Sequence, residues 1–426
     1  MDYTGKRVLI LGGSRVHCKI VEAAKRMGIY TIVADYLEQS PAKKLADESL
    51  LISILDADAI VKWCTENPVD AVINYSNDPV QKIHADICER LGLPRFCSKE
   101  FVAAFTNKKS FKEMCVRSGA GTIPSFAEKQ AIADEIPKEC YPLLVKPADS
   151  RGSRGQSICC NYDQLLNGIQ VAKNESFSGE IVIEKYLEDY DDLEISYLVV
   201  DGEPYLLKLE DRYPGSKANN LDRLCIATIA PSVHDAEYRE KVDPKIKKFI
   251  KDQGIQNGPV FLQGFWNDGD VYLYDPGLRI PGDNFDYAYT AITGISIPEL
   301  IIEYLITGTF RREAGSMLGN AVVNKPFAQL LPCIKPGTID EITGIDKVKA
   351  LPGVVSLEMD YLPGDTIKKE GNVKQRLAEI VVIGDDYADL GVKIEEIFKL
   401  LHAKDRFGDE MLIEPFSTAN LGKYYS

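Results

Sequence analysis

A lysine that closes an apolar segment stands directly before a loop with two glycines. The segment Tyr141–Gly155 reads YPLLVKPADSRGSRG, with Lys146 at the end of the apolar run and Gly152 and Gly155 in the loop. Backbone N–H groups beside glycine can approach phosphate oxygens closely, and an ammonium group adds a compact positive charge. The order differs from that of a P-loop, whose lysine follows the glycines and begins a helix. The segment therefore indicates either a phosphate-binding loop or an ordinary polar turn between two strands.

The composition is that of a soluble globular protein. The 426 residues predict two or three domains, and a net charge of −14 argues against a nucleic-acid binder, which needs a basic face. The ten cysteines lack paired spacing and predict reduced thiols. Neither a signal-peptide pattern nor an apolar run of spanning length is found, so we expect a cytoplasmic protein that is neither secreted nor inserted in a membrane.

Strands and helices alternate over the first hundred residues. The expected strands are Lys6–Leu11, Tyr30–Asp35, Glu48–Ile52 and Ala71–Asn74, and the expected helices are Val16–Met27 and Ala57–Glu66. This order predicts a doubly wound parallel sheet with helices on both faces. The turn at Gly12 and Gly13, with Asp35 after the next strand, lacks the third glycine of a dinucleotide fingerprint, which disfavours an NAD enzyme. The possibility that a ligand binds at the N-terminus of the following helix remains open.

Two β-hairpins are predicted in the middle of the chain. Asp201 and Gly202 separate the strands 194–200 and 205–209, and a turn at 267–269 separates 259–266 from 271–274. Beyond a helix at 297–307, strands alternate with Pro/Gly turns before a last helix at 387–401. The chain therefore predicts a multidomain α/β and α+β protein, with a separate α+β module at its C-terminal end.

Charged residues at element ends follow a definite order along the chain. They are Lys108, Lys146, Glu184, Glu194, Gln263, Asp275 and Arg279. Each one also has an ordinary explanation. Lys108 stands beside Lys109 and Lys112 on what could be a solvated helix face. Glu194 could be a cross-strand partner of a lysine, and Arg279 could pair with Asp283 on the surface.

In this order the chain resembles the ATP-grasp superfamily, with a layout similar to that of biotin carboxylases and L-amino-acid ligases. The segment 335–355 (KPGTIDEITGIDKVKALPGVV) is similar to the C-terminal part of the latter. The resemblance implies a doubly wound pre-ATP-grasp domain over 1–105, an ATP-grasp domain over 106–318 with its lid at about 120–187, and a C-terminal α+β domain over 319–426.

The resemblance also implies roles for individual residues. Lys108 and Lys146 correspond to the lysines that contact ATP phosphates, Glu194 to the acceptor of the ribose hydroxyls, and Arg279 to the arginine at the transferring phosphoryl group. The loop over the phosphates comprises Ser150, Arg151, Gly152, Ser153 and Gly155. The adenine-binding hinge comprises Glu184, Lys185, Tyr186 and Leu187. Positioned cations and metal are what phosphoryl transfer requires.

The chain departs from the family pattern at the metal ligands. The family has Glu and, twelve positions later, Glu-x-Asn-x-Arg, whereas this chain has Gln263 and Asp275-Pro276-Gly277-Leu278-Arg279. Mg²⁺ favours carboxylate oxygens, so the loss of one charge and one amide weakens at least one metal position. Either the site keeps one metal, Mg²⁺ or Mn²⁺, with help from Asp270, Asp283 or Asp286, or the protein binds nucleotide with little turnover.

The resemblance implies an ATP-dependent ligase that joins a carboxylate to an amine or thiol through an acyl-phosphate. Its alternative is a degenerate ATP-grasp protein that serves as a sensor or scaffold. Small-molecule substrates are the expected partners, with a homodimer as the assembly considered. The segment Asn74–Asp78, after the fourth strand, is either a contact to the acid substrate or a plain polar turn. The four histidines are scattered, which disfavours a zinc site.

Overall fold

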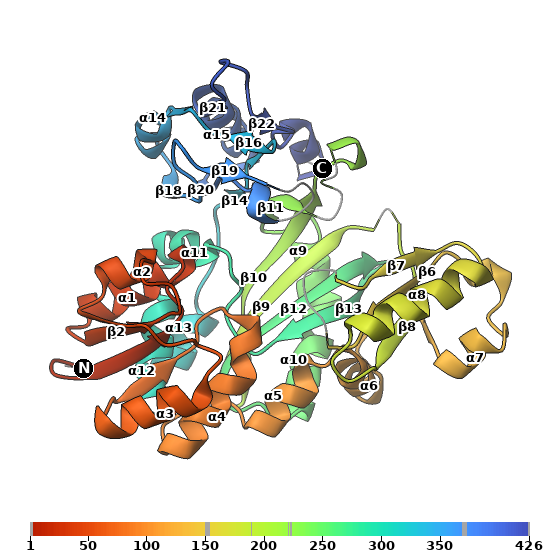
Figure 1. Cartoon of the computed structure of the whole chain (residues 1–426), viewed down its shortest axis with the longest axis horizontal. Coiled ribbons are helices and arrows are strands. Elements are labelled where there is room, and N and C mark those ends of the chain that lie inside the picture. Colours follow the sequence, from red (N-terminus) through yellow and green to blue (C-terminus); the bar gives the residue numbers. More distant parts are fainter. Residues whose placement is uncertain are drawn as a thin grey trace.

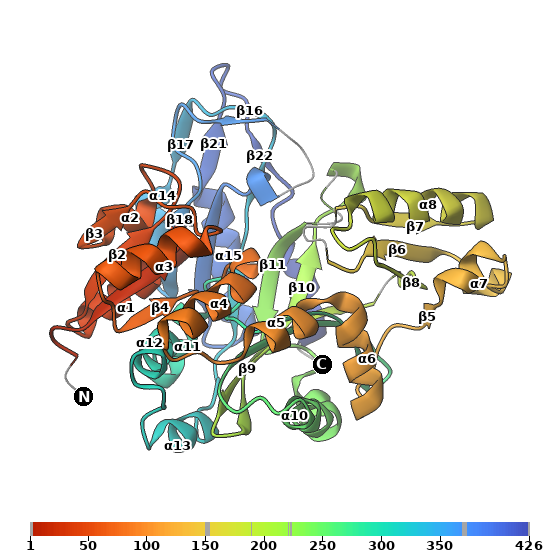
Figure 2. The same ribbon diagram turned by 60° about the horizontal axis from the view of Figure 1, so that its bottom comes forward.

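The structure is a computed structural model, and it describes residues 3–149, 154–188, 190–219, 221, 224–368 and 373–424. Figure 1 shows an N-terminal domain in red and orange on one side and a lid in yellow on the other. A green central sheet lies between them, and a blue C-terminal module lies above it. The lid projects away from the rest of the chain in both ribbon views (Figures 1 and 2).

The N-terminal domain is built on a four-stranded parallel sheet in the order β3-β2-β1-β4. Its strands are β1 (Arg7–Leu11), β2 (Tyr30–Ala34), β3 (Glu48–Leu50) and β4 (Ala71–Ile73). Along β1, Val8 and Ile10 join one hydrophobic core, whereas Leu9 and Leu11 join a second core on the other face. Both faces are therefore covered, and the doubly wound sheet predicted from the sequence is confirmed.

The centre of the molecule is an eight-stranded antiparallel sheet in the order β13-β12-β9-β10-β11-β14-β20-β18. Its strands are β9 (Asp192–Val200), β10 (Glu203–Pro214), β11 (Cys225–Ala230), β12 (Gly258–Asn267), β13 (Asp270–Gly277), β14 (Phe327–Leu330), β18 (Val354–Met359) and β20 (Ala378–Ile383). Both predicted hairpins are confirmed. At the first of them Asp201 and Gly202 have positive φ angles of 50° and 80°, as a tight two-residue turn requires.

The central sheet continues from the middle of the chain into the C-terminal module, because β11 pairs directly with β14. The module nevertheless has its own hydrophobic core, to which Ile380, Ile394 and Leu401 contribute. The boundary that we predict at residue 318 falls within helix α13 (Ala314–Gly319). The module is thus fixed to the sheet rather than attached through a linker.

The lid is a second, four-stranded antiparallel sheet in the order β5-β8-β6-β7. Its strands are β5 (Ser125–Phe126), β6 (Leu143–Pro147), β7 (Ser157–Cys159) and β8 (Ile181–Lys185). Helix α8 (Tyr162–Glu175) packs on this sheet through Leu165 and Ile169. The lid has its own small core.

The other elements connect or cover these sheets. The remaining helices are α1 (Cys18–Arg26), α2 (Pro41–Leu45), α3 (Ala57–Glu66), α4 (Gln81–Leu91), α5 (Lys99–Thr106), α6 (Lys108–Ser118), α7 (Glu128–Ile132), α9 (Asp235–Glu237), α10 (Asp243–Asp252), α11 (Phe285–Thr293), α12 (Ile297–Thr307), α14 (Ile345–Lys349) and α15 (Tyr387–Leu400). The remaining strands are β15 (Cys333–Ile334), β16 (Gly337–Thr338), β17 (Glu341–Thr343), β19 (Thr366–Ile367), β21 (His402–Lys404) and β22 (Leu412–Ile413).

Two further expectations can be compared with the structure. All ten cysteines are free, in agreement with reduced thiols. Among the described residues no single helix has the length and apolarity needed to cross a membrane. The pair Phe285–Thr293 and Ile297–Thr307 meets the test only jointly, and it is bent by 98°.

A buried lysine binds the central sheet to the loop before α11. The Lys208 ammonium lies 2.9 Å from Glu194 and 2.7 Å from Glu210, and it also donates to Asp283. Only 1% of the Lys208 side chain is exposed. Three carboxyl groups therefore share one buried cation. Burial raises the pKa of Glu210 to about 8 and that of Asp283 to about 6, and the Lys208 charge opposes both shifts.

Replacing Lys208 by methionine should strongly destabilise the fold. The substitution leaves three buried carboxylates facing one another, so we expect the free energy of unfolding to fall by about 3–5 kcal/mol. Urea unfolding followed by circular dichroism measures this change. Lys245→Met is the matched control, because Lys245 pairs with Asp270 at the surface and should cost less than about 1 kcal/mol. Equal losses in the two variants would contradict the prediction.

Candidate active site

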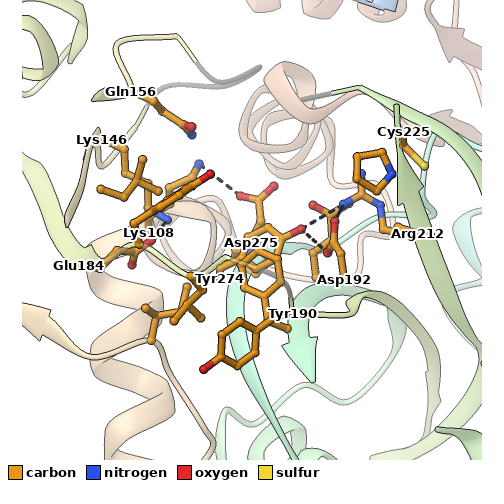
Figure 3. A pocket seen from close by; sticks show the side chains of 18 of the residues that line it. Lys108, Lys146, Gln156, Glu184, Tyr190, Asp192, Arg212, Cys225, Tyr274 and Asp275 are labelled. Carbon is orange, nitrogen blue, oxygen red and sulfur yellow. Dashed lines mark hydrogen bonds and ion pairs between the residues drawn. The ribbon is translucent and has the colours of Figure 1, made fainter. Parts of the chain in front are cut away.

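A cavity of about 1040 Å³ lies between the lid, the central sheet and the N-terminal domain. The lid contributes Lys146 and Glu184, helix α6 contributes Lys108, and the sheet contributes Asp275. Figure 3 shows these side chains around one opening, with Asp192, Arg212 and Tyr274 on the side away from the lid. Most of the residues that the sequence singled out for chemistry therefore meet at one place.

On the lid side, two lysines share one carboxylate. Glu184 accepts from Lys146 and, at 2.9 Å, from Lys112. Lys146 and Glu184 lie on adjacent strands, because Leu144 pairs with Glu184 and Lys146 follows two residues later on the same face. Lys112 comes from α6, one helical turn after Lys108, so both lysines lie on the same face of that helix. The sequence analysis missed Lys112, although this spacing was a usable signal.

At this cluster, burial and ion pairing shift the pKa values of the charged groups in opposite directions. Burial raises the pKa of Glu184, but Lys146 and Lys112 outweigh it and the pKa is lowered overall. Burial is the largest influence on Lys112 and lowers its pKa, against the attraction of Glu184. The cluster thus holds two cations beside the cavity around a single compensating anion.

Lys108 begins helix α6 and points across the cavity to the central sheet. Its ammonium lies 3.2 Å from Asp275 on β13. The Asn107 side chain caps the helix by accepting from the Lys109 and Ser110 backbone N–H groups, and the Lys108 N–H donates to the Ala148 carbonyl in the lid. These bonds fix where Lys108 leaves the backbone. Lys109, the next residue, points outward and pairs with Glu180 at the surface.

The opposite wall carries a polar group formed by Asp192, Arg212 and Tyr274. Arg212 donates to Asp192 at 2.6 Å and to the Tyr274 hydroxyl at 3.0 Å, and Tyr274 donates to Asp192 at 2.8 Å (Figure 3). Burial raises the pKa of Asp192, with Arg212 and Tyr274 opposing it. Asp192 precedes Glu194 by two residues and therefore shares its face of β9, which was a signal for its position.

Arg279 is held by the N-terminal domain. Its guanidinium donates through Nε and Nη2 to the two carboxylate oxygens of Asp78, the latter at 2.9 Å, and stacks on Phe261. Asp78 belongs to the segment 74–78 after β4, and it lines the cavity. Such a forked contact is the one that arginine makes with a phosphate or carboxylate ligand. Asp78 therefore occupies the groups with which Arg279 would bind an anion.

Glu194 and Gln263 form a contact with each other beneath the cavity. The Gln263 amide donates to Glu194 at 3.0 Å, and Glu194 also pairs with Lys208. The ordinary role that we considered for Glu194, as the partner of a cross-strand lysine, is thus realised in this structure. Its predicted contact to a ribose stays a prediction. Glu194, Glu210 and Asp283 have the spacing of a metal site, but the Lys208 ammonium lies among them.

Only part of the predicted hinge and phosphate loop lies within the described residues. Lys185, Tyr186 and Leu187 line the cavity, and the Tyr186 N–H is bonded to the Pro142 carbonyl at 2.9 Å. Gly155 has a φ of +70°, and a Cβ there would lie 2.7 Å from Glu175. Its neighbour Arg154 lines the cavity. The predicted contacts Ser150, Arg151, Gly152 and Ser153 lie outside the described residues.

At the predicted metal position the cavity offers Mg²⁺ the Asp275 carboxylate and the Gln263 amide oxygen. Asp275 lines the cavity with 38% of its side chain exposed, and Gln263 opposes it directly in the pairing of β12 with β13. Mg²⁺ is commonly held by one or two carboxylates together with phosphate oxygens and water, so this set fits one ion. The supplementary ligands that we considered are elsewhere: Asp270, Asp283 and Asp286 pair with Lys245, Lys208 and Lys19, and none of them lines the cavity.

Comparison with known proteins gives two family matches. Residues 101–257 match the carbamoyl-phosphate synthase L chain ATP-binding domain, and residues 329–404 match the L-amino acid ligase C-terminal domain 2. The first range includes the lid, helix α6 and strands β9 to β11, and the second includes most of the C-terminal module. Both matches agree with the resemblance to the ATP-grasp superfamily that the sequence pattern indicates.

Individual relatives are similar to this chain at low sequence identity. The 2-oxoglutarate carboxylase small subunit of Hydrogenobacter thermophilus is 25% identical over 319 residues, which are 68% of this chain and 65% of that one. A formate-dependent phosphoribosylglycinamide formyltransferase of Francisella tularensis is 26% identical over 70% of this chain and 80% of its own. The chain thus spans only about two thirds of the first relative.

Solved structures share the whole architecture. The L-amino acid ligase from Bacillus licheniformis superposes with a TM-score of 0.77 at 20% identity, over 94% of this chain and 98% of its own. The phosphoribosylglycinamide synthetase from Anaerococcus prevotii superposes with a TM-score of 0.75 at 19% identity, over 93% and 99%. At these identities the likeness establishes the fold.

The buried lid cluster should contribute strongly to the stability of the lid. Glu184→Gln removes the charge shared by Lys146 and Lys112, so we expect a loss of about 3 kcal/mol and faster amide hydrogen exchange in β6 and β8. Glu180→Gln is the matched control, since Glu180 pairs with Lys109 at the surface and should cost about 0.5 kcal/mol. Hydrogen exchange with mass spectrometry and urea unfolding measure both variants. Unchanged exchange in the Glu184 variant would contradict the assignment.

Proposed function

We propose that this protein is an ATP-dependent ligase that joins a small-molecule carboxylate to an amine or thiol and releases ADP and phosphate. The observation that carries the proposal is the cavity between the lid and the central sheet, where Lys108 and Lys146 face Asp275. Both lysines lie in the segment that matches an ATP-binding domain. Fixed cations around a cavity under a lid are what phosphoryl transfer requires from a protein. The ten free cysteines support action in the cytoplasm.

The proposed reaction has two steps. An oxygen of the acid attacks the γ-phosphorus of ATP, the bond to the β-phosphate oxygen breaks, and ADP leaves an acyl-phosphate behind. The amine then attacks the acyl carbon, phosphate departs, and the nitrogen loses a proton. Lys108, Lys146 and Arg279 would carry the charge of the transferring group. Closure of the lid would exclude water, which would otherwise hydrolyse the acyl-phosphate.

Arg279 supports this proposal through its contact with Asp78. A carboxylate that binds the guanidinium in a forked geometry imitates an acid substrate or a phosphoryl group. We infer that Asp78 is displaced when substrate binds. The segment 74–78 would then lie beside the bound acid substrate.

Mg²⁺ would be held by Asp275, with Gln263 as a second, weaker ligand, and a bound ion would neutralise charge on the phosphates. Neighbouring side chains position these two ligands. Lys108 keeps Asp275 in place, and the Gln263 amide is oriented by its bond to Glu194.

Lys108 and its neighbour Lys109 provide a test of ATP binding. We expect Mg²⁺ and ATP to stabilise the protein by about 2.7 kcal/mol at a concentration about 100 times the dissociation constant, as a thermal-shift titration measures. Lys108→Met should weaken ATP about 10-fold or more, because a charge-assisted contact to phosphate is lost, whereas Lys109→Met should not. The absence of any stabilisation of the wild-type protein by ATP would contradict the proposal.

Gln263→Glu separates a specialised ligase from a degenerate nucleotide binder. The substitution places a carboxylate against Glu194, and we expect ADP release dependent on acid and amine to fall about 10-fold. A screen of acid and amine pairs with coupled detection of ADP measures it, with exposed Gln256→Glu as the control. A gain in Mg²⁺ affinity and ATPase rate, from a wild-type protein without turnover, would instead support the sensor or scaffold.

A further inference from the structure

A row of polar side chains crosses the central sheet from the cavity into the C-terminal module. Strand register places them on one face, because directly paired residues and residues two apart on a strand share a face. From β13 to β18 the row comprises Asp275, Gln263, Glu194, Asp192, Arg212, Thr228, Gln329, Glu379 and Glu358. Most faces of a buried sheet are apolar, so this row marks a surface that serves something other than packing.

At the far end of the row two carboxylates face each other. Glu358 on β18 is paired directly with Glu379 on β20, and both side chains are partly buried. Glu379 accepts from the Asn284 amide at 3.0 Å, and the Tyr287 hydroxyl lies 3.4 Å from Glu358. Among the ion pairs of the described residues, none includes either glutamate. Like charges at directly opposed positions destabilise a sheet, so this arrangement has a cost without a visible compensation.

The cations in the neighbourhood have other partners. Lys19 lies 2.5 Å from Asp286, Arg15 lies 3.7 Å from Asp360, and Arg376 donates to the Cys225 carbonyl. Burial therefore dominates and raises the pKa of Glu379 to about 7, with Arg376 lowering it and Asp360 and Glu358 raising it further. Burial likewise raises the pKa of Glu358, against the influence of Lys19.

Thr228 gives an independent indication of a ligand at this surface. It stands between Arg212 and Gln329 in the row, is 5% exposed, and its hydroxyl has no hydrogen-bond partner. A buried hydroxyl without a partner costs free energy unless a ligand or water satisfies it. Nε of Arg376, which lies near Asp360, also has no hydrogen-bond partner.

We propose that Glu358 and Glu379 form the binding site for a primary ammonium group of one of the two substrates, which lies over the polar row with Thr228 as a further contact. Its role as a substrate site rests on the proposed ligase function. Strands are spaced about 4.8 Å apart, so Glu379 lies about 14 Å from Arg212 at the cavity, three strands away. That separation suits a substrate that extends from the cavity to the C-terminal module.

The ammonium group could come from the acid substrate, if that is an amino acid, or from the amine that attacks it. In both cases the two half-buried carboxylates supply acceptors for the donors of an ammonium group. Thr228, two strands away from Glu379, would contact another part of the same substrate. A neutral ligand would leave the two carboxylates uncompensated. The site therefore selects for charge on the ligand.

Binding of amines in the absence of nucleotide tests the site itself. A panel of L-amino acid amides and their N-acetyl counterparts, which lack the charge, is titrated against the full-length protein by thermal shift and calorimetry. We expect members of the free-amine series to bind, acetylation to abolish binding, and Glu358→Gln and Glu379→Gln each to weaken it at least 10-fold. Glu341→Gln, at an exposed position of the same module, is the control. No binding to the wild-type protein, or equal binding of acetylated amides, would overturn the proposal.

A second measurement identifies which substrate carries the group and keeps the two proposals separate. Hydroxylamine replaces the amine substrate, and formation of amino-acid hydroxamates with ATP is recorded for the wild-type protein and both variants. A loss in the variants assigns the ammonium to the acid, and hydroxamate formation unchanged from wild type assigns it to the attacking amine. ATP affinity should be unchanged in both variants. If ATP fails to bind while the amides bind, the ligase proposal falls and the ammonium site stands.

Discussion

The buried Lys208 ammonium is the interaction on which the geometry of the site depends. It joins Glu194 on β9, Glu210 on β10 and Asp283 in the loop before α11. Two of these carboxylates lead to further polar groups. Glu194 orients Gln263, while the loop at Asp283 leads directly to Asn284, which contacts Glu379. Since no ion in such surroundings can be removed cheaply, the relative positions of these groups are fixed by electrostatics as well as by packing.

The remaining charges of the cavity are arranged in pairs that a ligand can replace. Lys108 is held by Asp275 and Arg279 by Asp78, and both acidic side chains are substantially exposed, at 38% and 49%. Exposed ion pairs contribute little to stability, so their exchange for phosphate or carboxylate oxygens costs little. The Lys146, Lys112 and Glu184 cluster differs, because it is buried and forms part of the lid itself. The ion pairs that a ligand can replace are therefore partly exposed, whereas the pairs that stabilise the lid are buried.

The fold could be predicted well because each local pattern is strong and agrees with its neighbours. The Asp-Gly turn at 201–202, the doubly wound start and the helix at 297–307 follow from short-range chemistry. The pairing of β11 with β14 could not be predicted, since neither strand carries information about a partner a hundred residues away. For the same reason the sequence identified Lys108 and Lys146 but missed Lys112 and Asp192, whose position in the site depends on the register between elements.

The continuous sheet has a consequence for catalysis. Because β11, β14, β20 and β18 extend the same sheet that carries Asp275 and Gln263, the C-terminal module cannot change its distance from the cavity without breaking strand pairs. The lid, by contrast, has its own sheet and core and faces the cavity with its charged strands. Motion during a catalytic cycle must therefore be concentrated in the lid, while the surface from Arg212 to Glu358 stays rigid. In the proposed ligase, a rigid surface of this kind would discriminate between substrates by length and charge before the lid closed over the phosphates.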